Sequence, residues 1–153
     1  MLTLLLAVAL LSLSVIDLRT RRLPDWLTFP LIAIGLGVAF FDTPTAAPTY
    51  VLAATLGFLA LWLVATLYRR LRGTDGLGLG DAKLLAAAGA WLGPFYLAPT
   101  VFVGAVLTLV AALILRLLGR QVSLQSTLPF GPFLSVSFFG FWSLRISGWS
   151  PFL

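Results

Sequence analysis

The sequence predicts an all-α, polytopic membrane protein of about six transmembrane helices, forming a single domain over residues 1–153. Three observations support this fold class. Hydrophobic residues make up 60% of the chain and charged residues only 10%, whereas a soluble domain typically carries about 25% charged residues. The mean hydropathy is +1.06. Long apolar runs also recur between short segments of Pro, Gly and charged residues, which is the pattern of repeated membrane spans.

The segments of Pro, Gly and charged residues divide the chain into six apolar spans, each expected to be a helix. They cover residues 2–16, 26–41, 50–68, 82–93, 99–118 and 130–149. At 1.5 Å per residue the first span would be about 22 Å long and the fourth about 18 Å, against a hydrocarbon core of about 30 Å. Short spans place their ends below the membrane surface. Residues that flank these two spans are therefore expected to lie slightly inside the membrane.

Lysine and arginine predict the orientation. They follow the first, third and fifth spans, at Arg19, Arg21, Arg22, Arg69, Arg70, Arg72, Lys83, Arg116 and Arg120, and only Arg145 falls elsewhere. Connectors rich in Lys and Arg stay in the cytoplasm, so both termini are expected outside. The basic cluster directly after the first span indicates an anchor rather than a cleaved signal. Topology thus explains the net charge of +5; the expected partner is the lipid bilayer, and no nucleic acid is expected.

The residue types that are absent limit the chemistry. The chain has no cysteine and no histidine, which excludes disulfides, cysteine-ligated zinc, thiol catalysis and imidazole bases. Five aspartates remain as acid–base groups, and no metal or cofactor is expected. Ionisable groups at membrane depth are costly, so each is by default a candidate functional residue.

Asp81 is the first candidate, because it lies where a glycine-rich connector meets an apolar run. Gly76, Gly78 and Gly80 alternate with leucines before it, an arrangement that permits close approach of other groups, although a flexible connector is the simpler interpretation. Asp81 could also be only the N-cap of the following helix. Lys83 is either an interfacial anchor or a counter-charge for Asp81 or a substrate.

Asp17 is the second candidate, at the end of the first span. A helix C-terminus disfavours an anion, although a salt bridge to Arg21 four residues later could offset that cost. Asp17 and Asp81 share the predicted cytoplasmic face, where we expect a wet cleft. Of the remaining aspartates, Asp25 is expected in a solvated turn at a helix start, and Asp42 and Asp75 in loops.

Three stretches occur in order along the chain. Asp17 is followed by basic residues and Leu23-Pro24-Asp25. Next comes Gly78-Leu79-Gly80-Asp81-Ala82-Lys83, and then Leu128-Pro129-Phe130-Gly131-Pro132. Together they resemble the motifs of the type IV prepilin peptidase family, the membrane aspartic proteases with a Gly-x-Gly-Asp motif.

The resemblance implies a function and a set of site residues. Asp17 and Asp81 would be the catalytic pair, one ionised to activate water and one protonated to polarise the scissile carbonyl. Six residues would support the motifs, namely Gly78, Gly80, Lys83, Pro24, Pro129 and Gly131. The substrates would be prepilins or pseudopilins with a short basic leader, whose cations Asp25 and Asp75 could receive.

The sequence departs from the long bacterial form of this family. That form carries an N-terminal cytoplasmic insertion with paired Cys-x-x-Cys elements, linked to N-methylation of the mature pilin. Here 16 residues precede Asp17 and there is no cysteine. The resemblance therefore implies a short, peptidase-only form without an N-terminal methyltransferase region.

Two other functions compete with the peptidase. A small cation-coupled transporter would use paired membrane aspartates to bind or relay cations, and it would carry an ionisable group midway through a span. This sequence has no such group. A non-catalytic membrane scaffold of a secretion machine would tolerate amide replacement of both aspartates.

Overall fold

A computed structural model describes residues 1–73, 78–119 and 129–148, which form six α-helices and one short 3-10 helix. In chain order they are α1 (Leu2–Thr20), α2 (Asp25–Asp42), α3 (Ala47–Arg72), α4 (Leu79–Leu92), η1 (Pro94–Tyr96), α5 (Leu97–Leu117) and α6 (Gly131–Ile146). The predicted all-α class is confirmed.

Four segments of the described chain are long and apolar enough to cross a membrane: Leu2–Thr20, Asp25–Asp42, Ala47–Leu71 and Pro94–Leu117. The protein is therefore a multi-pass membrane protein. The helices α4, with 14 residues, and α6, with 16 residues, are shorter. The prediction that the fourth span is short is thus confirmed.

The prediction of a short first span is wrong. The helix α1 has 19 residues, about 28 Å at 1.5 Å per residue, because it continues past Asp17 as far as Thr20. The Thr20 hydroxyl donates to the carbonyl of Ile16, and Arg21 ends the helix in a left-handed conformation with φ 53°. Asp17 consequently lies within the helix rather than after it.

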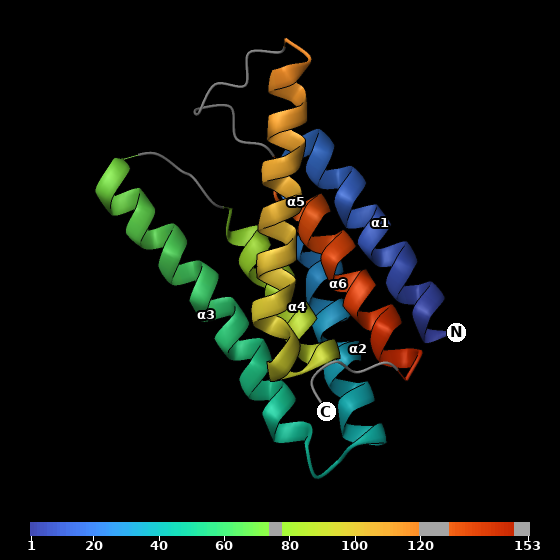
Figure 1. The fold of residues 1–153 in the computed structure, drawn as a ribbon. Helices are drawn as coiled ribbons and strands as arrows, with labels where there is room; N and C mark the ends of the chain where they lie inside the picture. The colour runs from blue at the N-terminus through green and yellow to red at the C-terminus, as the bar shows by residue number, and fades with distance from the viewer. Residues whose placement is uncertain (74–77, 120–128, 149–153) are drawn as a thin grey trace.

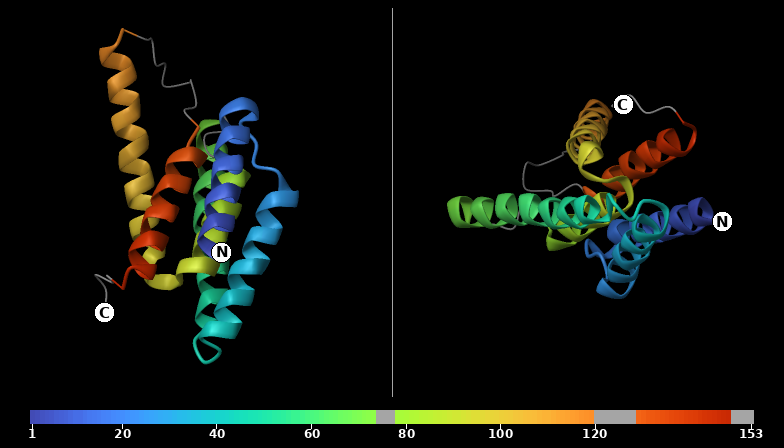
Figure 2. Two further views of the ribbon diagram at one scale, coloured as in Figure 1. Left: turned by 90° about the vertical axis from the view of Figure 1, so that its right-hand side faces the viewer. Right: turned by 90° about the horizontal axis from the view of Figure 1, so that it is seen from below.

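The helix α4 occupies the centre of the bundle, with the longer helices around it (Figures 1 and 2). All its residues from Asp81 to Leu92 are buried except Lys83. It packs most extensively against α3 and α2, and also against α6, which in turn packs against α1 and α5. A 14-residue helix covered on most sides can carry the run Ala86, Ala87, Ala88, Gly89 and Ala90, because small residues let neighbouring helices approach closely in a membrane.

Glycines mark two of the closest approaches. A Cβ on Gly89 would lie 2.6 Å from the backbone of Ala53 in α3, and a Cβ on Gly35 of α2 would lie 2.3 Å from the Trp91 ring. The Trp91 indole N–H donates to the carbonyl of Leu31 at 2.8 Å. These contacts hold α4 against α2 and α3.

Successive helices run in opposite directions, so the ends of the bundle differ (Figure 1). The end of α1 lies beside the beginnings of α4 and α6 at one end. The end of α2, the start of α3 and the ends of α4 and α6 lie at the other. Asp17 and Asp81 fall at the first of these ends.

Candidate active site

Asp81 lies in the first turn of α4, as its third residue. The N-cap of this helix is Gly78, three residues before Asp81, so the interpretation of Asp81 as the N-cap is wrong. The Gly78 backbone N–H donates to the Asp81 carboxylate, and the Asp81 N–H donates to the Gly78 carbonyl at 3.1 Å. An acidic residue at this position commonly satisfies the N-cap N–H in this way. The local sequence therefore fixes the Asp81 side chain against its own helix start.

Asp17 is held by another helix. The backbone N–H of Gly131, the first residue of α6, donates to the Asp17 carboxylate. A Cβ on Gly131 would lie 2.6 Å from Oδ2 of Asp17, so only glycine permits this approach. The position of Asp17 near the end of α1 is unfavourable for an anion, but the start of α6 offers it unpaired N–H groups and the positive end of a helix dipole. The arrangement offsets part of the cost of burying a carboxylate.

The structure brings the two aspartates together. The Asp17 carboxylate acts electrostatically on that of Asp81, so the two groups lie near each other although they belong to α1 and α4. Asp17 is 6% exposed and Asp81 is 7% exposed, so both are buried. Paired carboxylates of catalytic sites commonly share one proton. The pair therefore has the arrangement that carboxylate acid–base chemistry requires.

The connector between α1 and α2 packs against the first turn of α4. A Cβ on Gly80 would lie 2.7 Å from Cδ1 of Leu23 and 2.8 Å from its Cβ, so the glycine lets Leu23 pack directly on the helix start. Pro24 is the N-cap of α2 and Asp25 its first residue. These contacts fix the chain just beyond Asp17 against the turn that carries Asp81.

An ion pair joins the same elements at the surface. The Lys83 ammonium pairs with the Asp25 carboxylate and lies 5.4 Å from the centre of the Phe29 ring. The expectation that Lys83 serves Asp81 as a counter-charge does not match this contact, because its carboxylate partner is Asp25. Asp25 stays 59% exposed in its side chain, in agreement with a solvated helix start.

Two predicted site residues remain to be placed. Pro129 lies directly before Phe130, the N-cap of α6, and so precedes the helix start that binds Asp17. Asp75 lies outside the described residues. Sequence reasoning missed the role of Leu23 as the surface on which Gly80 packs; its place beside Pro24 in the first motif was the available signal.

Comparison with known proteins identifies the family. The model of the type IV leader peptidase family matches residues 4–114. Among curated relatives named prepilin leader peptidase/N-methyltransferase, that of Burkholderia pseudomallei is 44% identical over 130 residues, which cover 85% of this chain and 42% of the relative. The relative from Neisseria gonorrhoeae is 42% identical over 135 residues, covering 88% of this chain and 45% of the relative.

No solved structure matches the chain. The chain spans less than half the length of these curated relatives. The family model nevertheless includes both aspartates and the connector between α1 and α2 that packs on α4. The chain belongs to the type IV leader peptidase family.

Proposed function

We propose that this chain is a membrane aspartic endopeptidase that removes the basic leader peptide from type IV prepilins or pseudopilins at the cytoplasmic face of the bacterial inner membrane. One observation carries the proposal: two buried carboxylates, Asp17 of α1 and Asp81 of α4, interact with each other. Family membership supports the substrate class, since the relatives are named prepilin leader peptidases.

The chemistry follows from a shared proton. The ionised carboxylate takes a proton from a water molecule, whose oxygen attacks the scissile carbonyl, while the protonated carboxyl donates to the carbonyl oxygen. The tetrahedral intermediate then collapses, and the proton taken from water passes to the leaving amine. Because Gly78 and Gly131 fix the two carboxylates through backbone N–H groups, little reorganisation is needed at the moment of reaction.

The position of the pair suits a substrate that is itself a membrane helix. A prepilin carries its leader outside the bilayer and its apolar helix within it, so the scissile bond falls near the membrane surface. Asp25 keeps an exposed carboxylate beside Lys83, two residues after Asp81 in the chain. We assign Asp25, and with it Asp75, to the reception of leader cations.

Cleavage is tested by co-expressing this chain with candidate prepilins and measuring a leader-sized mobility shift, followed by N-terminal sequencing of the product. Purified chain with prepilin and S-adenosylmethionine should release a product with a free N-terminal amine, since these 153 residues lack the cysteine elements linked to methyl transfer. An unprocessed prepilin at normal membrane levels of both proteins would refute the peptidase.

The orientation is a separate proposal, based on the basic connectors. Reporter fusions after Arg72 should report the cytoplasm, and a fusion near Thr45, in the turn between α2 and α3, should report the outside. The same side for both fusions would contradict the cytoplasmic placement of the aspartate pair.

A further inference from the structure

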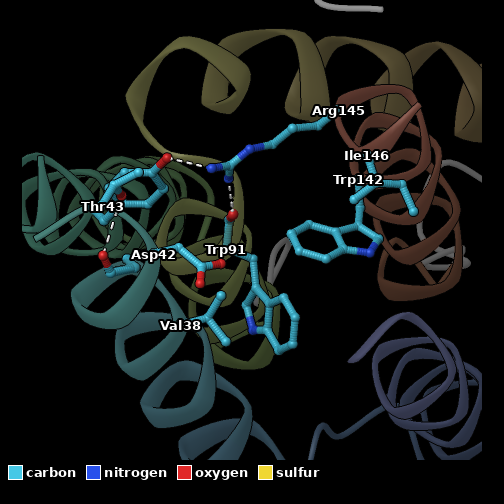
Figure 3. Close-up of a pocket in the computed structure, with 9 residues that line it drawn as sticks. Val38, Asp42, Thr43, Trp91, Trp142, Arg145 and Ile146 are labelled. Atoms are coloured by element: carbon cyan, nitrogen blue, oxygen red, sulfur yellow. Dashed lines mark hydrogen bonds between the residues drawn. The ribbon is translucent and has the colours of Figure 1, made fainter. Parts of the chain in front are cut away.

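A second polar site lies at the opposite end of the bundle from the aspartates. A cavity of about 160 Å³ opens there between the ends of α2, α4 and α6 and the start of α3. Figure 3 shows Arg145 reaching from α6 to Trp91, with Asp42 directed toward the same space from the end of α2. Nothing in the proposed peptidase chemistry uses these residues.

Arg145 is only half-buried and has donors to spare. Its guanidinium donates to the carbonyl of Trp91 near the end of α4, and to the Tyr50 hydroxyl at 2.6 Å. It also lies 5.3 Å from the centre of the Tyr50 ring and 6.0 Å from that of Trp142. A guanidinium carries five N–H donors in a planar fork suited to phosphate. Within the described part of the chain, these two bonds fix the orientation of the guanidinium and leave some of its N–H donors for a further acceptor.

Asp42 provides an opposite charge in the same cavity. It is exposed, and within the described residues no ion pair joins it to Arg145 or to another cation. A carboxylate and a guanidinium that line one cavity without pairing can each bind one end of a zwitterion. Asp42 was expected in a loop; the structure makes it the last residue of α2.

The surroundings place this cavity at a membrane interface. The apolar helices end here, and two tryptophans, Trp91 and Trp142, meet edge to face with ring centres 5.1 Å apart. Tryptophan and tyrosine are enriched where the hydrocarbon core gives way to headgroups. The ligand most available at this depth is a phospholipid headgroup.

We propose that the cavity binds the phosphoethanolamine headgroup of a phospholipid, with its phosphate on Arg145 and its primary ammonium on Asp42. The headgroup carries both charges two carbons apart, and its ammonium can donate hydrogen bonds to a carboxylate. A phosphatidylglycerol headgroup has no cation and would leave Asp42 facing a phosphate. A choline headgroup has a cation without N–H donors.

The test measures headgroup preference on the purified full chain in detergent. Native mass spectrometry would compare the first bound phosphatidylethanolamine with the first bound phosphatidylglycerol of identical acyl chains. We expect phosphatidylethanolamine to bind about tenfold more tightly, as one extra hydrogen bond between charged groups provides. Equal binding of the two lipids would overturn the proposal.

The variants separate the two charges. Asp42→Asn should bring the ratio close to one, whereas Asp25→Asn, the matched change at the other end, should leave it at the wild-type value. Arg145→Gln should weaken both lipids, because both present a phosphate. Arg145 also joins α6 to α4 and α3, so its variant could fail to accumulate. In that case the Asp42→Asn variant, at an exposed position, still tests the proposal. A preference that survives Asp42→Asn would overturn the assignment.

A soluble competitor distinguishes a lipid from a free zwitterion. Millimolar phosphoethanolamine should reduce the first lipid adduct while binding more weakly than the lipid, because it lacks the acyl chains that add apolar contact. If the soluble compound binds but the chain shows no preference among the lipids, the ligand of the cavity is not a lipid headgroup.

Discussion

The two ends of the bundle use the same helices to hold opposite charges. At one end the starts of α4 and α6 donate backbone N–H groups to Asp81 and Asp17. At the other end the Arg145 guanidinium donates to the Trp91 carbonyl, near the C-terminus of α4. Asp81 and Asp17 thus face helix N-termini and Arg145 faces a helix C-terminus, as the helix dipole favours.

The difference between the ends lies in burial and pairing. Asp17 and Asp81 are buried beside a like charge, an arrangement that costs stability and that a fold retains only for a function. Arg145 is half-buried and makes neutral hydrogen bonds and ring contacts that stabilise the packing of α6. The comparison supports the proposed chemistry at the first end, whereas at the second end the contacts of Arg145 hold α6 against its neighbours.

The largest effect is expected from the aspartates. Asp17→Asn and Asp81→Asn should each lower cleavage by at least about 10²–10⁴-fold, the usual contribution of general acid–base catalysis. An amide keeps an oxygen that can accept the N–H of Gly131 or Gly78, so the protein should still insert and accumulate. Cleavage is measured at matched membrane levels of each variant. Substantial activity of either variant at wild-type abundance would exclude the dyad.

The next effect is expected from Gly131, the glycine in contact with the Asp17 carboxylate. Gly131→Ala introduces a Cβ 2.6 Å from Oδ2 of Asp17, so the carboxylate must move. A misplacement of about 1 Å can cost about a hundredfold in rate, and we expect a loss of that order in kcat. Gly140→Ala on the same helix is the matched control, because its Cβ meets no atom within 4 Å. Equal activity of the two alanine variants would mean that α6 does not position Asp17.

The sequence predicted the helices well and singled out the two aspartates that the structure brings together, because both depend on local patterns; the catalytic role of the aspartates stays a prediction. Apolar runs mark helices directly, and the aspartates stand out in a chain with five acidic residues. What it could not predict were contacts between segments far apart in the chain. The pairing of Lys83 with Asp25, 58 residues away, and the N–H of Gly131 on Asp17 depend on how the helices pack. The length of α1 was underestimated because polar residues at its end continue the helix without adding hydropathy.

A third effect concerns the stability of the contact between α2 and Trp91 of α4. Gly35→Ala places a Cβ 2.3 Å from Cδ1 of Trp91 and threatens the indole bond to Leu31. Overpacking of this kind typically costs about 1–3 kcal/mol, which should appear as a lower Tm in detergent. The control Gly37→Ala, with open space around its Cβ, should leave Tm unchanged or slightly raised. If both variants unfold at the wild-type Tm, α2 can move away from Trp91 without cost.

The smallest effect is expected from the ion pair of Asp25 with Lys83, whose side chains are 59% and 22% exposed. Such a pair contributes about 0.2–1 kcal/mol, so neither neutral variant should unfold the protein. Because the Asp25 carboxylate remains open to a basic leader, we expect Asp25→Asn to raise KM severalfold with little change in kcat. The effect should shrink at high salt, which screens exposed charges.

The double variant Asp25→Lys with Lys83→Asp separates leader binding from helix positioning. Reversal restores an ion pair between α2 and α4, so stability should return to the wild-type value. It also presents a lysine at the exposed position where the leader cations would arrive, so KM should rise further than in Asp25→Asn. A wild-type KM in the reversed pair would contradict leader binding by Asp25 and leave the ion pair as a fastening between the two helix starts. That outcome would make the pair of Asp25 and Lys83 comparable to Arg145, which also joins neighbouring helices through its hydrogen bonds.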